Sequence, residues 1–73
     1  MNRRLDTLGL LCPLPVLKIQ KQMRIMDSGD ILTVLADDPA SAVDIPFYCK
    51  ENGHRLVNQS QINDHWQFQI KKK

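Results

Sequence analysis

The sequence has few of the residues that stabilise small extracellular domains or that cross membranes. It contains two cysteines among 73 residues, so at most one disulfide is possible, and a reducing cytoplasm disfavours even that bond. No apolar run approaches the roughly 18 residues that a membrane span needs. Arg3 and Arg4 are followed by Asp6 instead of an apolar stretch, so we expect no secretory signal, no membrane association and a cytoplasmic location.

The composition also excludes disordered and low-complexity chains. There are three glycines and four prolines, and 42% of the residues are hydrophobic while 25% are charged. A chain of this size buries about 60% of the surface that its unfolded form exposes, which suffices for one small core. We therefore expect a single domain over residues 1–73, and a monomer.

Positive charge is concentrated at the two ends of the chain. The net charge is +2, from ten basic and eight acidic residues, but five of the basic residues lie within the first four and the last three positions. Between residues 5 and 70, five basic residues accompany eight acidic ones, a balance of −3. Domains that hold nucleic acid usually carry positive charge on the folded body, so we expect no direct nucleic acid binding.

The first helix is predicted from apolar residues that follow the second proline. Val16, Ile19, Met23 and Met26 fall on one face at about 100° per residue. Gly29 is a natural stop for this helix because it tolerates a left-handed backbone.

A second helix is predicted over residues 40–52. Asp38 is expected to be its N-cap, with Pro39 at the first helical position. Pro46 cannot donate a hydrogen bond to the carbonyl four residues earlier, so we expect it to kink or split the helix near residues 44–45. Gly53 is expected to end the helix.

Four segments have the composition of strands, over residues 4–7, 30–36, 55–59 and 65–71, and a turn around residues 62–64 joins the last two. In the last segment Trp66, Phe68 and Ile70 alternate with polar residues, so one sheet face is expected to be solvated. This order predicts an α+β fold, a two-layer α/β sandwich of βαβαββ order with two helices on one face of a four-stranded mixed sheet.

The strongest candidates for a chemical role lie in one segment, Gly9-Leu10-Leu11-Cys12-Pro13-Leu14-Pro15. Gly9 permits a tight turn. Cys12 directly precedes a helix, where unpaired N–H groups and the helix dipole favour negative charge, so we expect an exposed thiol with a lowered pKa. The alternative is a buried structural cysteine. Pro13 and Pro15 fit a first helical turn, and we expect the helix to begin at one of them.

Further short segments accompany this motif along nearly the whole chain. They are Leu5-Asp6, Gly9-Leu10, Cys12-Pro13-Leu14-Pro15, Gly29-Asp30, Ala36-Asp37-Asp38-Pro39-Ala40, Asp44-Ile45-Pro46, Gly53-His54 and Phe68-Gln69-Ile70-Lys71-Lys72. In this order and at these spacings, they resemble the TusA/SirA-like family of small sulfur carrier proteins.

The resemblance implies sulfurtransferase activity without a cofactor. Cys12 would accept sulfane sulfur as a persulfide from a cysteine desulfurase or another donor protein, and would pass it to a downstream acceptor protein. In the best-known branch of the family the sulfur ends at the wobble uridine of tRNA, although the carrier does not itself modify the tRNA. Four motif residues would surround the cysteine at the helix N-terminus: Gly9, Leu10, Pro13 and Pro15.

Leu11 and Leu14 differ from that branch, whose motif resembles Arg-Cys-Pro-Glu-Pro. Without a cation beside Cys12, one source of thiolate stabilisation is missing. The two leucines instead form an apolar collar, which we expect to contact partners. Other members of the family are tied to sulfur oxidation or thiosulfate handling, so these destinations stay open beside tRNA thiolation.

Lys18, Lys21 and Arg24 are expected on the exposed side of the first helix, whose N-terminus presents Cys12. One interpretation is an ordinary solvated face. The other is that the three charges steer an acidic partner toward the thiol.

Structural roles are predicted for the remaining polar candidates. Cys49 shares the apolar face of the second helix and is expected in the core. The two histidines lack the spacing of a zinc site, so we expect no metal. Asp37, Asp38 and Asp44 are expected to cap helices or to form turns.

The sequence leaves two classes of function open. The first is a sulfur carrier that acts through Cys12. The second is a non-catalytic protein-interaction or redox-regulatory module that docks through the first helix. The exposure and reactivity of Cys12 distinguish them.

Overall fold

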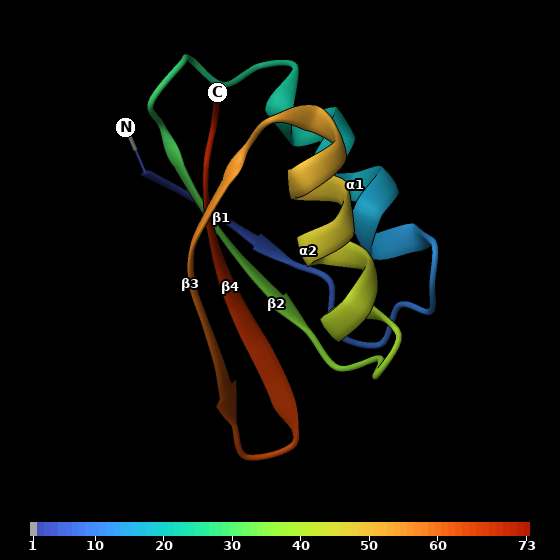
Figure 1. Ribbon diagram of the computed structural model, residues 1–73. Coiled ribbons are helices and arrows are strands. Elements are labelled where there is room, and N and C mark those ends of the chain that lie inside the picture. Colours follow the sequence, from blue (N-terminus) through green and yellow to red (C-terminus); the bar gives the residue numbers. More distant parts are fainter. Residues whose placement is uncertain (1) are drawn as a thin grey trace.

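The computed structural model describes residues 2–73 as four strands and two helices (Figure 1). Their order is β1 (Asn2–Asp6), α1 (Leu14–Met23), β2 (Ile31–Ala36), α2 (Ser41–Asn52), β3 (Arg55–Ile62) and β4 (His65–Lys71). The predicted βαβαββ order and α+β class are confirmed. In this part of the chain, neither helix is long and apolar enough to cross a membrane.

The strands form one mixed sheet in the order β1-β2-β4-β3. β1 and β2 are parallel, whereas β4 is antiparallel to both of its neighbours. Both helices cover the same face of the sheet (Figure 1), which confirms the predicted two-layer sandwich. Because β1 and β2 are parallel, their carboxyl ends meet at one end of the sheet, and the loops that follow them are neighbours.

The core lies between the sheet and the two helices. Phe68 and Ile70 of β4 are fully buried and Trp66 is partly buried, so the predicted alternation of β4 is confirmed. Cys49 of α2 is also buried, as expected. A fully buried large apolar side chain contributes about 1.5–3 kcal/mol. The other large members of the core that are fully buried are Ile19, Leu32, Val34 and Ile45.

The first helix is shorter than predicted. It ends at Met23 instead of near Gly29, and Arg24 is its C-cap. The backbone N–H groups of Ile25 and Met26 each donate to the carbonyl three residues earlier, so the chain tightens into turns beyond the helix. Met26 still reaches the core from this turn, which explains why it fits the apolar periodicity.

The second helix runs unbroken through Pro46, so the split predicted as one outcome of this proline does not occur. Pro46 costs the helix one hydrogen bond, but Ile45 and Cys49 on either side of it are anchored in the core. The N-cap is Ala40 and not Asp38. Asp38 instead stabilises the turn before the helix, since its carboxylate accepts a hydrogen bond from the Ala40 N–H. Gly53 ends the helix at a φ of 74°, as predicted.

The strand boundaries also differ at three places. β1 spans residues 2–6 instead of 4–7, although Thr7 still donates both its backbone N–H and its hydroxyl to the Leu35 carbonyl. β2 begins at Ile31, one residue later than expected. β3 continues to Ile62, and its register with β4 shifts by one residue at a bulge between Leu56 and Asn58.

Candidate functional site

The loop between β1 and α1 is held in place by the loop that follows β2. Gly9 has a φ of 81°, a left-handed conformation that favours glycine. Its N–H donates to both carboxylate oxygens of Asp37, at 2.9 and 3.1 Å. The Leu10 N–H closes the turn on the Thr7 carbonyl at 3.2 Å. The parallel pairing of β1 with β2 thus brings Asp37 to the loop that carries Cys12.

Cys12 is exposed, and its backbone is fixed by a second aspartate. Its N–H donates to Asp38 Oδ2 at 2.7 Å. A bond of this length to an ionised acceptor is among the stronger hydrogen bonds in proteins. The predicted exposure of Cys12 is therefore confirmed, and Asp37 and Asp38 together define the position of the loop. The peptide bond between Cys12 and Pro13 is cis.

The Cys12 side chain meets Asp44 in the first turn of α2. Its Sγ donates a hydrogen bond to Asp44 Oδ2. This bond raises the pKa of the Cys12 thiol above its ordinary value, and slight desolvation and the negative charges of Asp44 and Asp38 act in the same direction. The lowered pKa predicted from the helix N-terminus is wrong.

The first turn of α1 offers few free N–H groups to the sulfur. α1 begins at Leu14, with Pro13 as the N-cap, so the helix begins at neither of the two prolines. Pro13 and Pro15 have no N–H, and the Leu14 N–H donates to the Leu11 carbonyl at 2.9 Å. The carboxylate therefore dominates the electrostatics of the thiol.

Exposed apolar side chains lie near Cys12 and Asp44 in the sequence, in the Cys12 loop and on both helices. Leu11 is 70% exposed and Leu14 is 45% exposed, so the predicted apolar collar is present at the surface. α2 adds Val43 and Phe47, which are also exposed. The sequence interpretation missed this contribution because it assigned α2 to the core alone.

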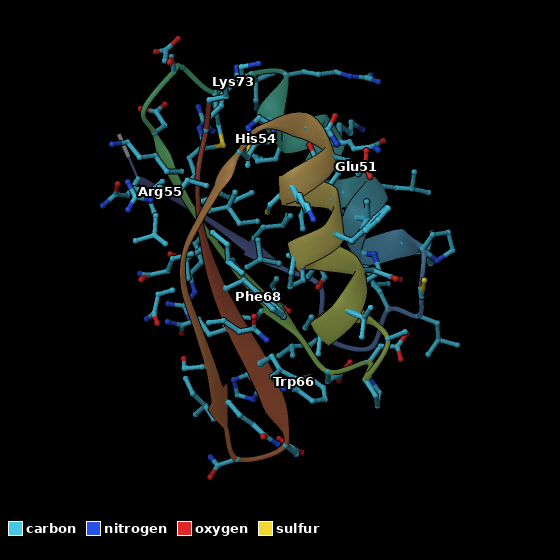
Figure 2. The ribbon with its side chains drawn as sticks, viewed as in Figure 1. Glu51, His54, Arg55, Trp66, Phe68 and Lys73 are labelled. Atoms are coloured by element: carbon cyan, nitrogen blue, oxygen red, sulfur yellow. The ribbon has the colours of Figure 1, made fainter. Side chains whose placement is uncertain are left out.

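A shallow groove of about 400 Å³ runs between the two helices, beginning next to Cys12. Pro13, which follows Cys12, and Asp44, which binds its sulfur, are both in the groove lining. Glu51, labelled in Figure 2, lies two turns farther along α2. The lining is completed by Val16, Gln20, Phe47, Tyr48 and Asn52.

The three basic residues predicted to lie on the first helix are exposed, as expected, but only two of them belong to the helix. Lys18 and Lys21 lie on α1, whereas Arg24 caps its end. Arg24 borders a different hollow, of about 500 Å³, together with His54 and Lys72. That hollow lies where both helices end, where the Lys73 N–H donates to His54 Nδ1 at 3.1 Å (Figure 2).

Cys49 has none of the properties of a second reactive thiol. It is only 2% exposed, and burial raises the pKa of its thiol to about 11. Within residues 2–73, no group of three histidine, cysteine, aspartate or glutamate side chains is placed to hold a metal ion.

Asp44 is the site residue that the sequence interpretation did not identify. We expected it to be a cap or a turn former, but its carboxylate contacts the Cys12 sulfur. The available signal was its position in the first turn of the helix that follows β2, because β2 ends beside the Cys12 loop.

Comparison with known proteins gives one family and one fold. The chain matches the family described as sulfurtransferase TusA over residues 3–72. Its structure is similar to the crystal structure of a SirA-like protein from Desulfitobacterium hafniense, with a TM-score of 0.82 and 24% sequence identity. That match covers 94% of this chain and 95% of the other.

Proposed function

Because the chain belongs to the sulfurtransferase TusA family, whose general role is sulfur transfer, we propose that Cys12 is the residue that carries the sulfur. The observation that supports this assignment is the contrast between its two cysteines. Cys12 is exposed beside a carboxylate, whereas Cys49 is buried in the core. A group that passes sulfur between proteins has to be accessible to both of them.

The proposed donor is a cysteine desulfurase or another protein that presents a persulfide. The Cys12 thiolate attacks the outer sulfur of the donor persulfide, a Cys12–sulfur bond forms, and the bond between the two donor sulfurs breaks. The donor cysteine leaves as a thiolate. The outer sulfur keeps its oxidation state throughout, so no external oxidant or reductant is needed.

Asp44 is proposed to accept the Cys12 proton during this step. Its carboxylate already receives the S–H group. When a partner covers the site and excludes water, the proton needs an acceptor within the interface, and Asp44 is within reach. The proton then returns to the departing donor thiolate, which balances the charge.

The second half of the proposed cycle hands the sulfur to an acceptor protein. An acceptor thiolate attacks the outer sulfur of the Cys12 persulfide and releases the Cys12 thiolate. Thiolation of tRNA is one candidate end of the relay, reached through the acceptor and without direct tRNA binding by this chain. The proposed location of the relay is the cytoplasm.

The test is sulfur loading of the Cys12→Ser variant. Incubation with a cysteine desulfurase and cysteine should add about 32 Da, one sulfur atom, to the wild type and nothing to the variant. The variant should keep its fold, because the exposed serine hydroxyl can donate to Asp44 as the thiol does. A sulfur-bearing Cys12→Ser protein would overturn the assignment, and circular dichroism of the variant checks its fold.

A further inference from the structure

The lining of the groove between α1 and α2 combines apolar and aromatic residues with two carboxylates. Asp44 stands at the end next to Cys12, and Glu51 stands two turns away. No lysine or arginine is in its lining, and within residues 2–73 neither carboxylate forms an ion pair. Two carboxylates without a cation, beside an exposed apolar surface, favour a ligand that brings its own positive charge.

Three residues of α2 form a stripe along this groove. Asp44, Phe47 and Glu51 are spaced at i, i+3 and i+7, so they lie on one side of the helix. At 1.5 Å per residue, Asp44 and Glu51 are about 10 Å apart along the helix axis. Phe47, between them, is 61% exposed.

An extended peptide matches this spacing. Its residues advance about 3.3 Å each, so about three residues span the distance from the sulfur end of the groove to Glu51. The apolar surface of Phe47 then meets a residue in the middle of such a segment. The peptide side chain that meets Glu51 then lies about three positions after the peptide residue that contacts Cys12.

We propose that this groove binds an extended segment of the partner protein that carries the reacting cysteine, with an apolar residue over Phe47 and a lysine or arginine at Glu51. The inference rests on the proposed function, since it assumes that Cys12 exchanges sulfur with a partner cysteine. It goes beyond that function by stating the chemistry of the segment. The segment has a cysteine, then an apolar residue, and then a lysine or arginine about three positions after the cysteine. The cation lies away from Asp44, which keeps its carboxylate free to take the proton.

The experiment uses two short peptides and the intact protein. Each peptide carries a cysteine activated as a mixed disulfide with thionitrobenzoate, a leucine one residue after that cysteine, and either lysine or glutamate three residues after the cysteine, so that the last two side chains share one face of the extended peptide. Cys12 attacks the peptide sulfur, forms a disulfide with it and releases thionitrobenzoate, whose absorbance gives the rate. Each rate is divided by the iodoacetamide rate of the same variant, so that changes in thiol reactivity cancel.

The wild type should react about two- to fivefold faster with the lysine peptide than with the glutamate peptide at low salt, the range of an exposed ion pair. Glu51→Lys should reverse this preference, and high salt should remove it. Phe47→Ala should slow both peptides several-fold, as loss of an apolar anchor does. Two remote changes serve as matched controls: Asp64→Lys at the β3–β4 turn, and Val57→Ala on β3.

Equal rates for the two peptides with the wild type would overturn the proposal. So would an Asp64→Lys effect as large as that of Glu51→Lys, because the preference would then reflect net charge and not the groove. Failure of the proposed function is a separate result: Cys12 would acquire no persulfide from any protein donor, while the peptide preference would remain measurable.

Discussion

Cys12 and Asp44 are 32 positions apart in the sequence, and the thiol of the first donates a hydrogen bond to the carboxylate of the second. The contact joins the loop after β1 to the first turn of α2. It favours the protonated thiol in the free protein and so raises the pKa of Cys12, since the same carboxylate opposes the negative charge of a thiolate. The sulfur atom is thus exposed, while its hydrogen bond to Asp44 opposes ionisation of the thiol.

The first prediction separates the effect of Asp44 on the pKa of Cys12 from its proposed role as the proton acceptor. Asp44→Asn should lower the pKa of Cys12, because it removes a hydrogen-bond acceptor and a negative charge that favour the protonated thiol. Below the pKa, the alkylation rate rises about tenfold per pH unit, so the variant should react faster with iodoacetamide between about pH 7 and 8. Sulfur transfer from a protein donor should nevertheless slow, because the proton acceptor is lost.

The measurement is the pH profile of alkylation beside a transfer rate. The wild-type profile should level off at a higher pH than that of an ordinary cysteine, and the Asp44→Asn profile at a lower pH than the wild type. Asp64→Asn, in the β3–β4 turn, is the control with the same charge change. Faster transfer by Asp44→Asn would show that thiolate supply, and not proton removal, limits the reaction.

The second prediction concerns which thiol reacts. Iodoacetamide should label Cys12 in the native protein and leave Cys49 unlabelled, because Cys49 is buried and the pKa of its thiol is raised to about 11. Unfolding in guanidinium should expose both. Peptide mapping by mass spectrometry assigns each label, and native labelling of Cys49 ahead of Cys12 would contradict the assignment of the reactive thiol.

The third prediction is a loss of stability at alkaline pH. The folded pKa of Cys49, about 11, lies above the value of about 8.5 for an unfolded thiol. The folded state therefore holds this proton more tightly, and its contribution is present below about pH 8.5 and is lost as the pH rises toward 11. Cys49 should contribute up to about 3 kcal/mol of this decline.

Urea unfolding from about pH 8 to pH 10.5 measures this decline. Cys49→Ala should flatten it, although some slope should remain because burial also raises the pKa of Tyr48. An unchanged slope in the variant would show that Cys49 does not cause it.

The fourth prediction tests the basic side of α1. Lys18→Glu combined with Lys21→Glu should slow association with a sulfur donor or acceptor whose outer surface is acidic, because both lysines are exposed on the helix that follows Cys12. The loss should shrink as salt rises, since the Debye length is about 10 Å at 0.1 M. The measurement is the transfer rate of the wild type and of the double variant at several ionic strengths. Equal rates for the two proteins at low salt would show that this face is only solvated and does not guide association.

The fold could be predicted because its signals are local and repeated. The alternation of Phe68 and Ile70 and the apolar face around Ile19 each identify an element and its buried side. The end of α1 could not be predicted, because Met26 follows the helical spacing and yet reaches the core from a turn. Pro46 indicated an interruption of α2, but the helix runs through it because the packing of its neighbours in the core outweighs the one lost hydrogen bond.

The site could be predicted only in part. The exposure of Cys12 follows from the prolines around it, whereas its bond to Asp44 depends on how α2 sits against the Cys12 loop. That placement is set by the pairing of β1 with β2 and by the hydrogen bonds of Asp37 and Asp38. The sign of the Cys12 pKa shift therefore needed the three-dimensional arrangement.

The burial of Cys49 sets the stoichiometry of the carrier. With the second cysteine enclosed, a folded chain offers a single exposed thiol, so under the proposed function it takes one sulfur atom from a donor and has to pass that atom on before it can be loaded again. An acceptor that incorporates two sulfur atoms would then need two separate deliveries. For the same reason, a disulfide between two folded chains can form only through Cys12, and thiol exchange reverses such a bond.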